Sequence, residues 1–221
     1  MGRCYVNKGM EDGERSDESR TMSGLDWPEF QSRYVESAAY HEAGHMTAAV
    51  IQKMPLQERG IHVDLKGSGI CYYWHRTPGD LENTEQARFE RELTITTIYS
   101  GWGAQRTIFP DCSALAWDGD RREVALLLRE MHSADVNERT AAQTELWEKA
   151  RKLVAKHWST IEPLAKTLWA KPNTQQSQAE IEQNWSHGQT TLEKWMSGPE
   201  VVEFFQKLGI PCHIRGDSEG K

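Results

Sequence analysis

The sequence predicts a mainly α fold with one small β-hairpin. Apolar residues recur at three- and four-residue steps along several long stretches, which is typical of helices. Only one region places two β-rich runs on either side of a glycine-bearing turn. Hydrophobic residues make up 38% of the 221 residues, which is enough for one sizeable core beneath a polar surface.

The first expected helix runs from about Pro28 to Met54, where Pro55 should end it. The hairpin follows. Its two runs are Ile61–Leu65 and Ile70–Trp74, with two glycines in the turn between them.

The rest of the chain is expected to be helical, apart from a polar, glutamine-rich loop over 171–189. The expected helices span Asn83–Ile108, Asp120–Met131, Ala134–Trp158, Ser159–Ala170 and Gly198–Leu208. This pattern predicts three parts of the chain. They are a disordered polar tail over 1–26, the main domain over 27–171, and a linker with a short helix and a polar tail over 172–221.

Composition argues against several classes of function. The net charge of -7 argues against a nucleic-acid partner, because phosphate binding requires a basic face. No apolar run approaches the roughly 20 residues that span a membrane, and none resembles a signal peptide, so a cytoplasmic protein is expected. The four cysteines form no CxxC pair, which indicates neither a disulfide framework nor a cysteine-based zinc cluster.

Chemistry is indicated by the run His41-Glu42-Ala43-Gly44-His45. Four-residue spacing puts both imidazoles on one face of a helix, where they can hold one metal ion together. Glu42 lies beside them and can act as general base on a water at that metal. Zinc suits this arrangement, because it lowers the pKa of its bound water to about 7. His41 and His45 are therefore predicted zinc ligands, and Glu42 is the predicted catalytic residue.

A catalytic zinc usually has a third protein ligand, and spacing alone leaves that ligand open. A metzincin would have a histidine ten residues after His41, but Ile51 stands there, which excludes that class. A downstream glutamate, Glu82 or Glu85, is one solution. An aspartate at the start of a later helix is the other.

Three segments resemble the FtsH-type zinc proteases, in the same order along the chain. The run Ala39–His45 resembles the zinc helix of that family, and Tyr99–Arg106 is similar to its GGRAAEE segment. The spacing of Asp120, Val124, Arg129 and Met131 is similar to its DLxxATxxARxMV helix. The resemblance covers roughly residues 35 to 170. It departs from the family at Gln105, where glutamate is usual, and at Arg121, where leucine or isoleucine is usual.

This resemblance implies a helical, zincin-like peptidase domain of FtsH type. The family's third zinc ligand falls on Asp120, with Asp118 as the alternative two residues away. Peptides or unfolded proteins are the implied substrates. The sequence contains no GxxxxGK[ST] motif, so ATP-driven unfolding would need a separate ATPase partner, and a homo-oligomer is a further possibility.

Two other functions remain open at this stage. One is a non-catalytic binding or regulatory module that keeps the peptidase fold, although an intact Glu42 argues against it. The other is a zinc hydrolase that acts on a non-peptide amide, because the water-activating chemistry is the same.

Overall fold

The computed structural model describes residues 27–65, 67–75, 77, 79, 84–110, 118–132, 135–175 and 192–215. The expected tail over 1–26 lies outside this part, as does most of the expected loop over 171–189. The described part is mainly helical, with a small antiparallel sheet. None of its helices combines the length and apolar character that a membrane span requires.

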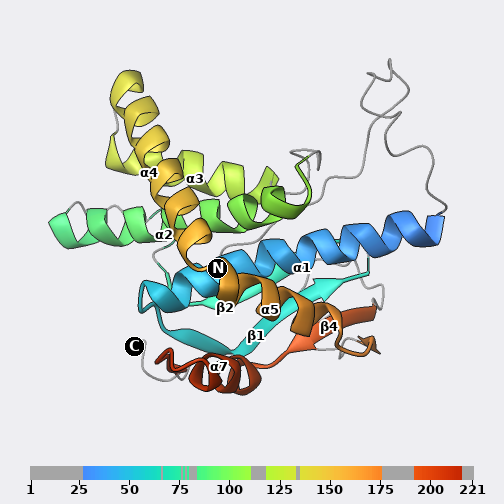
Figure 1. Cartoon of the computed structure of the whole chain (residues 1–221). Coiled ribbons are helices and arrows are strands. Elements are labelled where there is room, and N and C mark those ends of the chain that lie inside the picture. Colours follow the sequence, from blue (N-terminus) through green and yellow to red (C-terminus); the bar gives the residue numbers. More distant parts are fainter. Residues whose placement is uncertain are drawn as a thin grey trace, which may run out of the picture.

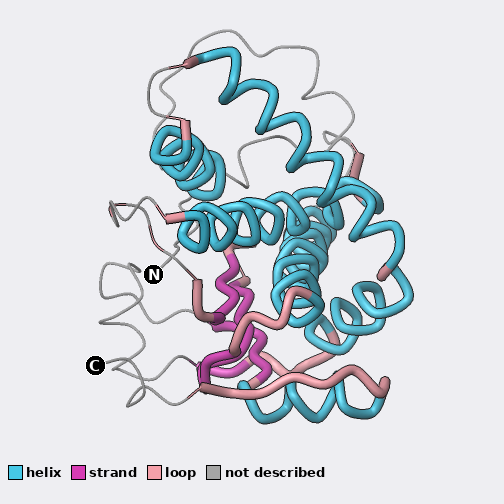
Figure 2. Tube along the Cα trace, turned by 90° about the vertical axis from the view of Figure 1, so that its left-hand side faces the viewer, coloured by secondary structure: helices cyan, strands magenta, loops and turns pink. Residues whose placement is uncertain are grey.

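The helices and strands stack in layers around a central helix, α1 (Trp27–Ile51). One face of α1 lies on the sheet, beside α5 (Trp158–Trp169), and α7 (Gly198–Lys207) covers the opposite face of the sheet. The other side of α1 carries α2, α3 and α4, whose bounds are Glu85–Ile108, Asp118–Met131 and Val136–Lys156. Figures 1 and 2 show the sheet lying between α7 and the main helical layer.

Helix α1 is buried on nearly all sides from Ser37 to Val50. It ends at Ile51, three residues earlier than the sequence suggested, because the chain closes a left-handed turn there. Lys53 has φ +60°, and the amide of Met54 donates to the carbonyl of Ala49. This is the pattern of a Schellman C-cap, so the helix stops before Pro55 is reached.

The expected hairpin is present, but it belongs to a larger sheet. β1 (Leu56–Asp64) pairs antiparallel with β2 (Gly69–Tyr73), and their register shifts between Leu56 and Ile61, where Gly60 has φ +68°. On its other side β1 pairs with β4 (Leu192–Met196), which pairs in turn with β3 (Thr174–Gln175). The strand order β2-β1-β4-β3 leaves β2 at an edge of the sheet formed by the described strands.

Strands β3 and β4 correct the prediction of a hairpin alone. Their residues fall in the segment that the sequence suggested was a linker, because Glu193 and Lys194 make β4 look polar. In the structure Glu193 is buried, and its carboxylate lies 3.1 Å from Nδ1 of His62 on β1. The helix expected after this segment is confirmed as α7, which begins with a capping box between Ser197 and Glu200.

Other helix boundaries also differ from expectation by one or two residues, as α4 and α5 illustrate. α4 starts at Val136, because the carboxylate of Asp135 accepts hydrogen bonds from the first amides of the helix. α5 starts at Trp158, directly after a break at His157, and not at the expected Ser159-Thr160 cap.

The buried apolar residues form two clusters. The first lies between α1, the sheet, α5 and α7, and includes Met46, Ile61, Leu164 and Phe205. The second joins α2, α3 and α4; its buried members are Ile95, Ile98, Tyr99, Val124, Leu127, Leu128, Leu146 and Ala150. The face of α1 that carries the two histidines lies between these clusters.

Candidate metal centre

The two histidines of α1 point toward the same small space, and an aspartate from α3 meets them there. The Nε2 atoms of His41 and His45 lie 2.9 Å apart. Oδ2 of Asp120 is 2.9 Å from Nε2 of His41 and 3.3 Å from Nε2 of His45. All three side chains are buried, with at most 5% of each residue exposed. Two donor atoms from α1 and one from Asp120, which lies 79 residues after His41, therefore converge in the interior.

These separations suit a metal ion closely. Zinc bonds of about 2.0–2.2 Å at tetrahedral angles place the donor atoms about 3.3 Å apart. The three observed separations lie within about half an ångström of that value, so small adjustments of the side chains would complete the site. A further sign of a binding site is Oε2 of Glu42. This atom is buried and has no hydrogen-bond partner in the part of the chain that the structure describes.

The Nδ1 atom of each imidazole already has a hydrogen-bond acceptor. Nδ1 of His45 donates to the backbone carbonyl of Thr97 at 3.0 Å, and a carbonyl can only accept. Nδ1 of His41 donates to the side-chain oxygen of Gln105 at 3.1 Å. The amide of Gln105 is oriented in turn by donating to Oγ of Ser37 at 2.7 Å. In the neutral rings both Nε2 lone pairs therefore face the shared space, as metal-binding histidines require.

Close packing of α1 against α2 makes this geometry possible. A Cβ at Gly44 would overlap the backbone oxygen of Ser100, and a Cβ at Gly101 would overlap the ring of His45. Gly101 lies inside α2 and contacts the His45 imidazole, so this glycine permits the close approach of the two helices.

Glu42 points from α1 toward the edge strand β2. It is 2% exposed, and a Cβ at Gly69 would overlap its side chain. A carboxylate oxygen of Glu42 lies within 4.8 Å of ligand nitrogens of both His41 and His45. Glu42 is thus near the shared space without taking part in the contacts between the histidines and Asp120.

Charges in the site are strongly coupled. Burial raises the pKa of Glu42, and the two histidines only partly offset this effect. Burial by itself lowers the pKa of His45, but the charge and hydrogen bond of Asp120 outweigh it and raise the pKa to about 9. The same histidines hold the pKa of Asp120 well below its usual range, although burial opposes them. The site therefore favours positive charge beside Asp120, which either protons or a metal cation can supply.

Asp120 is positioned by the first turn of α3. That helix begins at Asp118, two residues earlier than expected. Asp120 is therefore the third residue of the helix and not its first. Asp118 is only half-buried, and among the described contacts none joins it to either histidine. Of the two aspartates that the resemblance left open, Asp120 is the one that meets the imidazoles.

Of the two glutamates of the other solution, the structure describes only Glu85, and it does not meet the histidines. Glu85 is exposed in the first turn of α2, twelve residues before Thr97, or about 18 Å along the helix. Glu82 lies outside the described residues.

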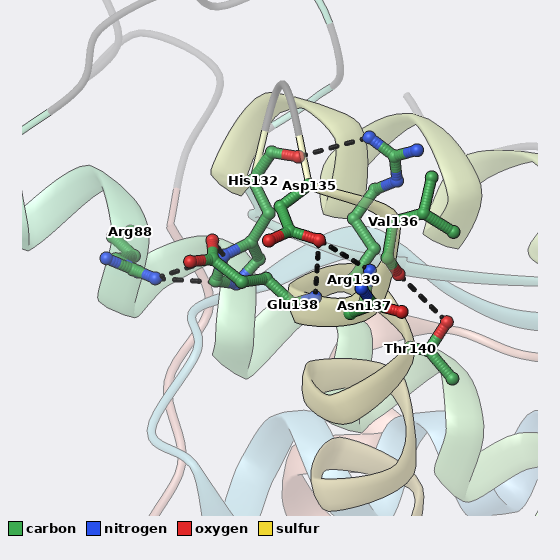
Figure 3. A network of polar contacts seen from close by, with 8 residues as sticks. All are labelled: Arg88, His132, Asp135, Val136, Asn137, Glu138, Arg139 and Thr140. Carbon is green, nitrogen blue, oxygen red and sulfur yellow. Dashed lines mark hydrogen bonds and ion pairs between the residues drawn. The ribbon is translucent and has the colours of Figure 1, made fainter.

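The far end of α3 is anchored by polar contacts, which fix the direction of the helix that carries Asp120. Arg91 on α2 is 1% exposed and donates to Glu130 at 3.2 Å. Figure 3 shows the neighbouring network, in which His132 lies between Arg88 and Glu138. The guanidinium of Arg139 donates to the carbonyl of His132, so α4 also holds this end of α3.

Two contributors to the site were not identified from the sequence. Gln105 was noted only as a departure from the usual glutamate, although its contact with His41 explains why an acceptor is needed there. Cys71 on β2 was not expected near the site. Burial raises the pKa of its thiol, and the negative charges of Glu42 and Asp120 add to this effect.

Neither the known protein-family models nor the curated proteins searched contain a match to this chain. The resemblance to FtsH-type proteases therefore depends on the motif residues themselves.

Proposed function

We propose that the chain is a zinc-dependent metallopeptidase with a zincin-like domain of FtsH type. The observation that carries this proposal is the meeting of three buried donor atoms, Nε2 of His41, Nε2 of His45 and Oδ2 of Asp120. Hydrogen bonds on the opposite nitrogens of both rings leave their lone pairs for a metal. Two nitrogens and one carboxylate oxygen form a donor set that suits zinc and leaves a fourth position open.

His41, His45 and Asp120 would hold the ion, and Glu42 would transfer the proton. When bound, zinc supplies Lewis-acid chemistry, because it lowers the pKa of a water and polarises a carbonyl group. Glu42 accepts the proton of the attacking water and then delivers it to the leaving nitrogen. A pKa raised by burial suits a group that must both take up and release a proton near neutral pH.

The edge strand supports a peptide as the substrate. Within the described sheet, β2 has a partner on one side only, and Gly69 at its start contacts Glu42. An extended peptide can pair with such an edge through backbone hydrogen bonds. Its carbonyl groups would then pass beside the Glu42 carboxylate. This geometry favours a peptide bond over an isolated amide as the bond that is broken.

Metal analysis and a peptidase assay test the proposal together. The purified protein should contain one zinc ion per chain and should cleave casein or a peptide library. Glu42→Gln should retain zinc but lose at least two orders of magnitude in kcat. Glu36→Gln, on the same helix and outside the site, is the matched control and should behave as wild type. Stoichiometric zinc without any cleavage by the wild-type protein would favour a non-catalytic binding module.

A further inference from the structure

A second hollow lies beyond the end of α1 and plays no part in the proposed chemistry. Its volume is about 500 Å³, within the range of sites that bind small molecules or large side chains. It opens between the end of β2 and the first half of α2. Its lining includes Met54, Trp74, His75, Phe89, Leu93 and Arg215.

One wall of this hollow is connected to the metal centre through α2. Leu93 lies one helical turn before Thr97, whose carbonyl accepts from His45. Gln52, also in the wall, donates to the Thr97 hydroxyl at 2.6 Å and to the Leu93 carbonyl at 3.3 Å. The hollow therefore begins one helical turn from the residue that orients His45.

The opposite wall is connected to the centre through α3. Nδ1 of His75 lies 3.7 Å from a carboxylate oxygen of Glu123, and Glu123 is three residues after Asp120. The hollow is thus connected to the metal centre through two sets of residues that do not overlap.

The distance between the two sites corresponds to a few residues of extended peptide. Gln52 follows His45 by seven residues, or about 10 Å along the helix direction. Along β2, Trp74 follows Gly69 by five residues, or about 17 Å. Because an extended chain advances about 3.3 Å per residue, the hollow is about three to five residues from the bond beside Glu42.

The lining mixes polar and apolar groups, and its apolar members can contact a large apolar side chain. Phe89 is 53% exposed at the rim, so its ring is accessible to a side chain that enters the hollow. Trp74 is held in place: its indole N–H donates to the carbonyl of Arg215 at 3.4 Å, and the Arg215 guanidinium lies 5.2 Å from its ring centroid. Met54 and Leu93 add aliphatic surface.

We propose that this hollow is a specificity subsite that receives an aromatic or large aliphatic side chain of an extended peptide, three to five residues from the scissile bond. The inference rests on the proposed peptidase function. Every strand pair of the sheet is antiparallel, and β2 runs from the metal centre toward the hollow. A peptide added antiparallel to β2 therefore places this residue on the amino-terminal side of the scissile bond.

Peptide scanning with Phe89 variants tests the subsite. A peptide that the wild-type protein cleaves is varied by moving a single phenylalanine through the positions three to five residues before the cleaved bond, with alanine at the others. We expect phenylalanine at one position to raise kcat/KM about tenfold over alanine. Phe89→Ala should reduce this preference to about threefold or less, and Phe89→Asp should reduce it further. Cleavage of the all-alanine peptide gives the baseline of each protein, and the preference is the ratio of kcat/KM to that baseline.

Ile108→Ala is the matched control, because Ile108 is a 40% exposed apolar residue near the other end of the same helix. It should keep the full preference. The subsite is refuted if no position shows a preference, or if Phe89→Asp retains it.

A binding experiment separates failure of the subsite from failure of the peptidase function. Fluorescent alanine-based peptides that carry one phenylalanine at each position in turn, chosen without reference to cleavage, are titrated into zinc-loaded Glu42→Gln protein. If the wild-type protein cleaves nothing, the peptidase function fails. A preference for phenylalanine in Kd that Phe89→Asp abolishes would still support the hollow as a peptide-binding site, and equal Kd values for all peptides would overturn it.

Discussion

Gln105 offers a sharp test of the metal centre, because it contacts a proposed ligand and not the metal. Replacement by leucine keeps the volume of this 3% exposed side chain but removes the oxygen that accepts from Nδ1 of His41. The imidazole then loses the contact that fixes its tautomer and its rotation. We expect Gln105→Leu to bind zinc more weakly while it keeps the fold.

The size of this effect follows from how the ligand is held. Hydrogen-bonded partners of metal-ligating histidines typically contribute a factor of 10 to 100 in metal affinity. That range corresponds to about 1.4–2.7 kcal/mol. Asp120 also lies against His41, but it approaches Nε2 on the metal side and cannot replace the lost acceptor. Gln105→Glu keeps an acceptor at this position and should stay within about threefold of wild type or bind more tightly.

Competition with a chromophoric chelator measures the affinity, and circular dichroism with thermal melting shows whether each variant is folded. Gln206→Leu, at an exposed position on α7, is the control for adding a leucine. A folded Gln105→Leu protein with wild-type zinc affinity would refute the argument that this contact orients His41 for the metal.

Three further predictions follow from the same contacts. Gly101→Ala should disrupt zinc binding far more than an alanine elsewhere on α2, because the new Cβ overlaps the His45 ring; isothermal titration of zinc into the variant measures the loss. Burial and, secondly, the charge of Asp120 raise the pKa of Glu123 to about 7. A raised carboxyl pKa means that the folded protein retains a proton that the unfolded chain loses near its ordinary value of 4.5, so this group lowers stability as pH rises from about 4.5 to 7. In the metal-free protein Glu123→Gln should therefore gain up to about 3 kcal/mol over wild type at pH 8 and little at pH 4, as urea unfolding would show; equal gains at both pH values would contradict this. Free zinc at about 100 times its Kd should stabilise the wild-type protein by about 2.7 kcal/mol, and chelation should reverse the gain; Asp120→Asn should show a much smaller response at the same zinc concentration.

Local patterns in the sequence predicted most of the helices, because helical periodicity and caps are encoded by residues a few positions apart. The hairpin could be predicted for the same reason. The full sheet could not, because β4 pairs with β1 more than 120 residues earlier and its buried Glu193 pairs with His62 on that strand. A charged residue in a short polar segment predicts a surface loop unless its distant partner is known.

In the metal centre too, some residues could be predicted from local sequence and others could not. His41 and His45 could be placed on one face from their spacing alone, and the structure brings their Nε2 atoms together. Asp120 came from a family resemblance, since nothing local to it indicates a partner 79 residues away. The role of Gln105 required the packing of α1 on α2, which depends on glycines whose contacts no single-sequence pattern reveals.

The position of α1 between two separate hydrophobic clusters has a consequence for how the molecule fails. His41 and His45 lie on α1, whereas Asp120, Gln105 and the Thr97 carbonyl belong to α2 and α3. A slight shift of α1 relative to these two helices would separate the donors while every helix and strand stayed intact. Mild heat or denaturant should therefore release the ion before the chain unfolds, and a bound ion should hold these helices together.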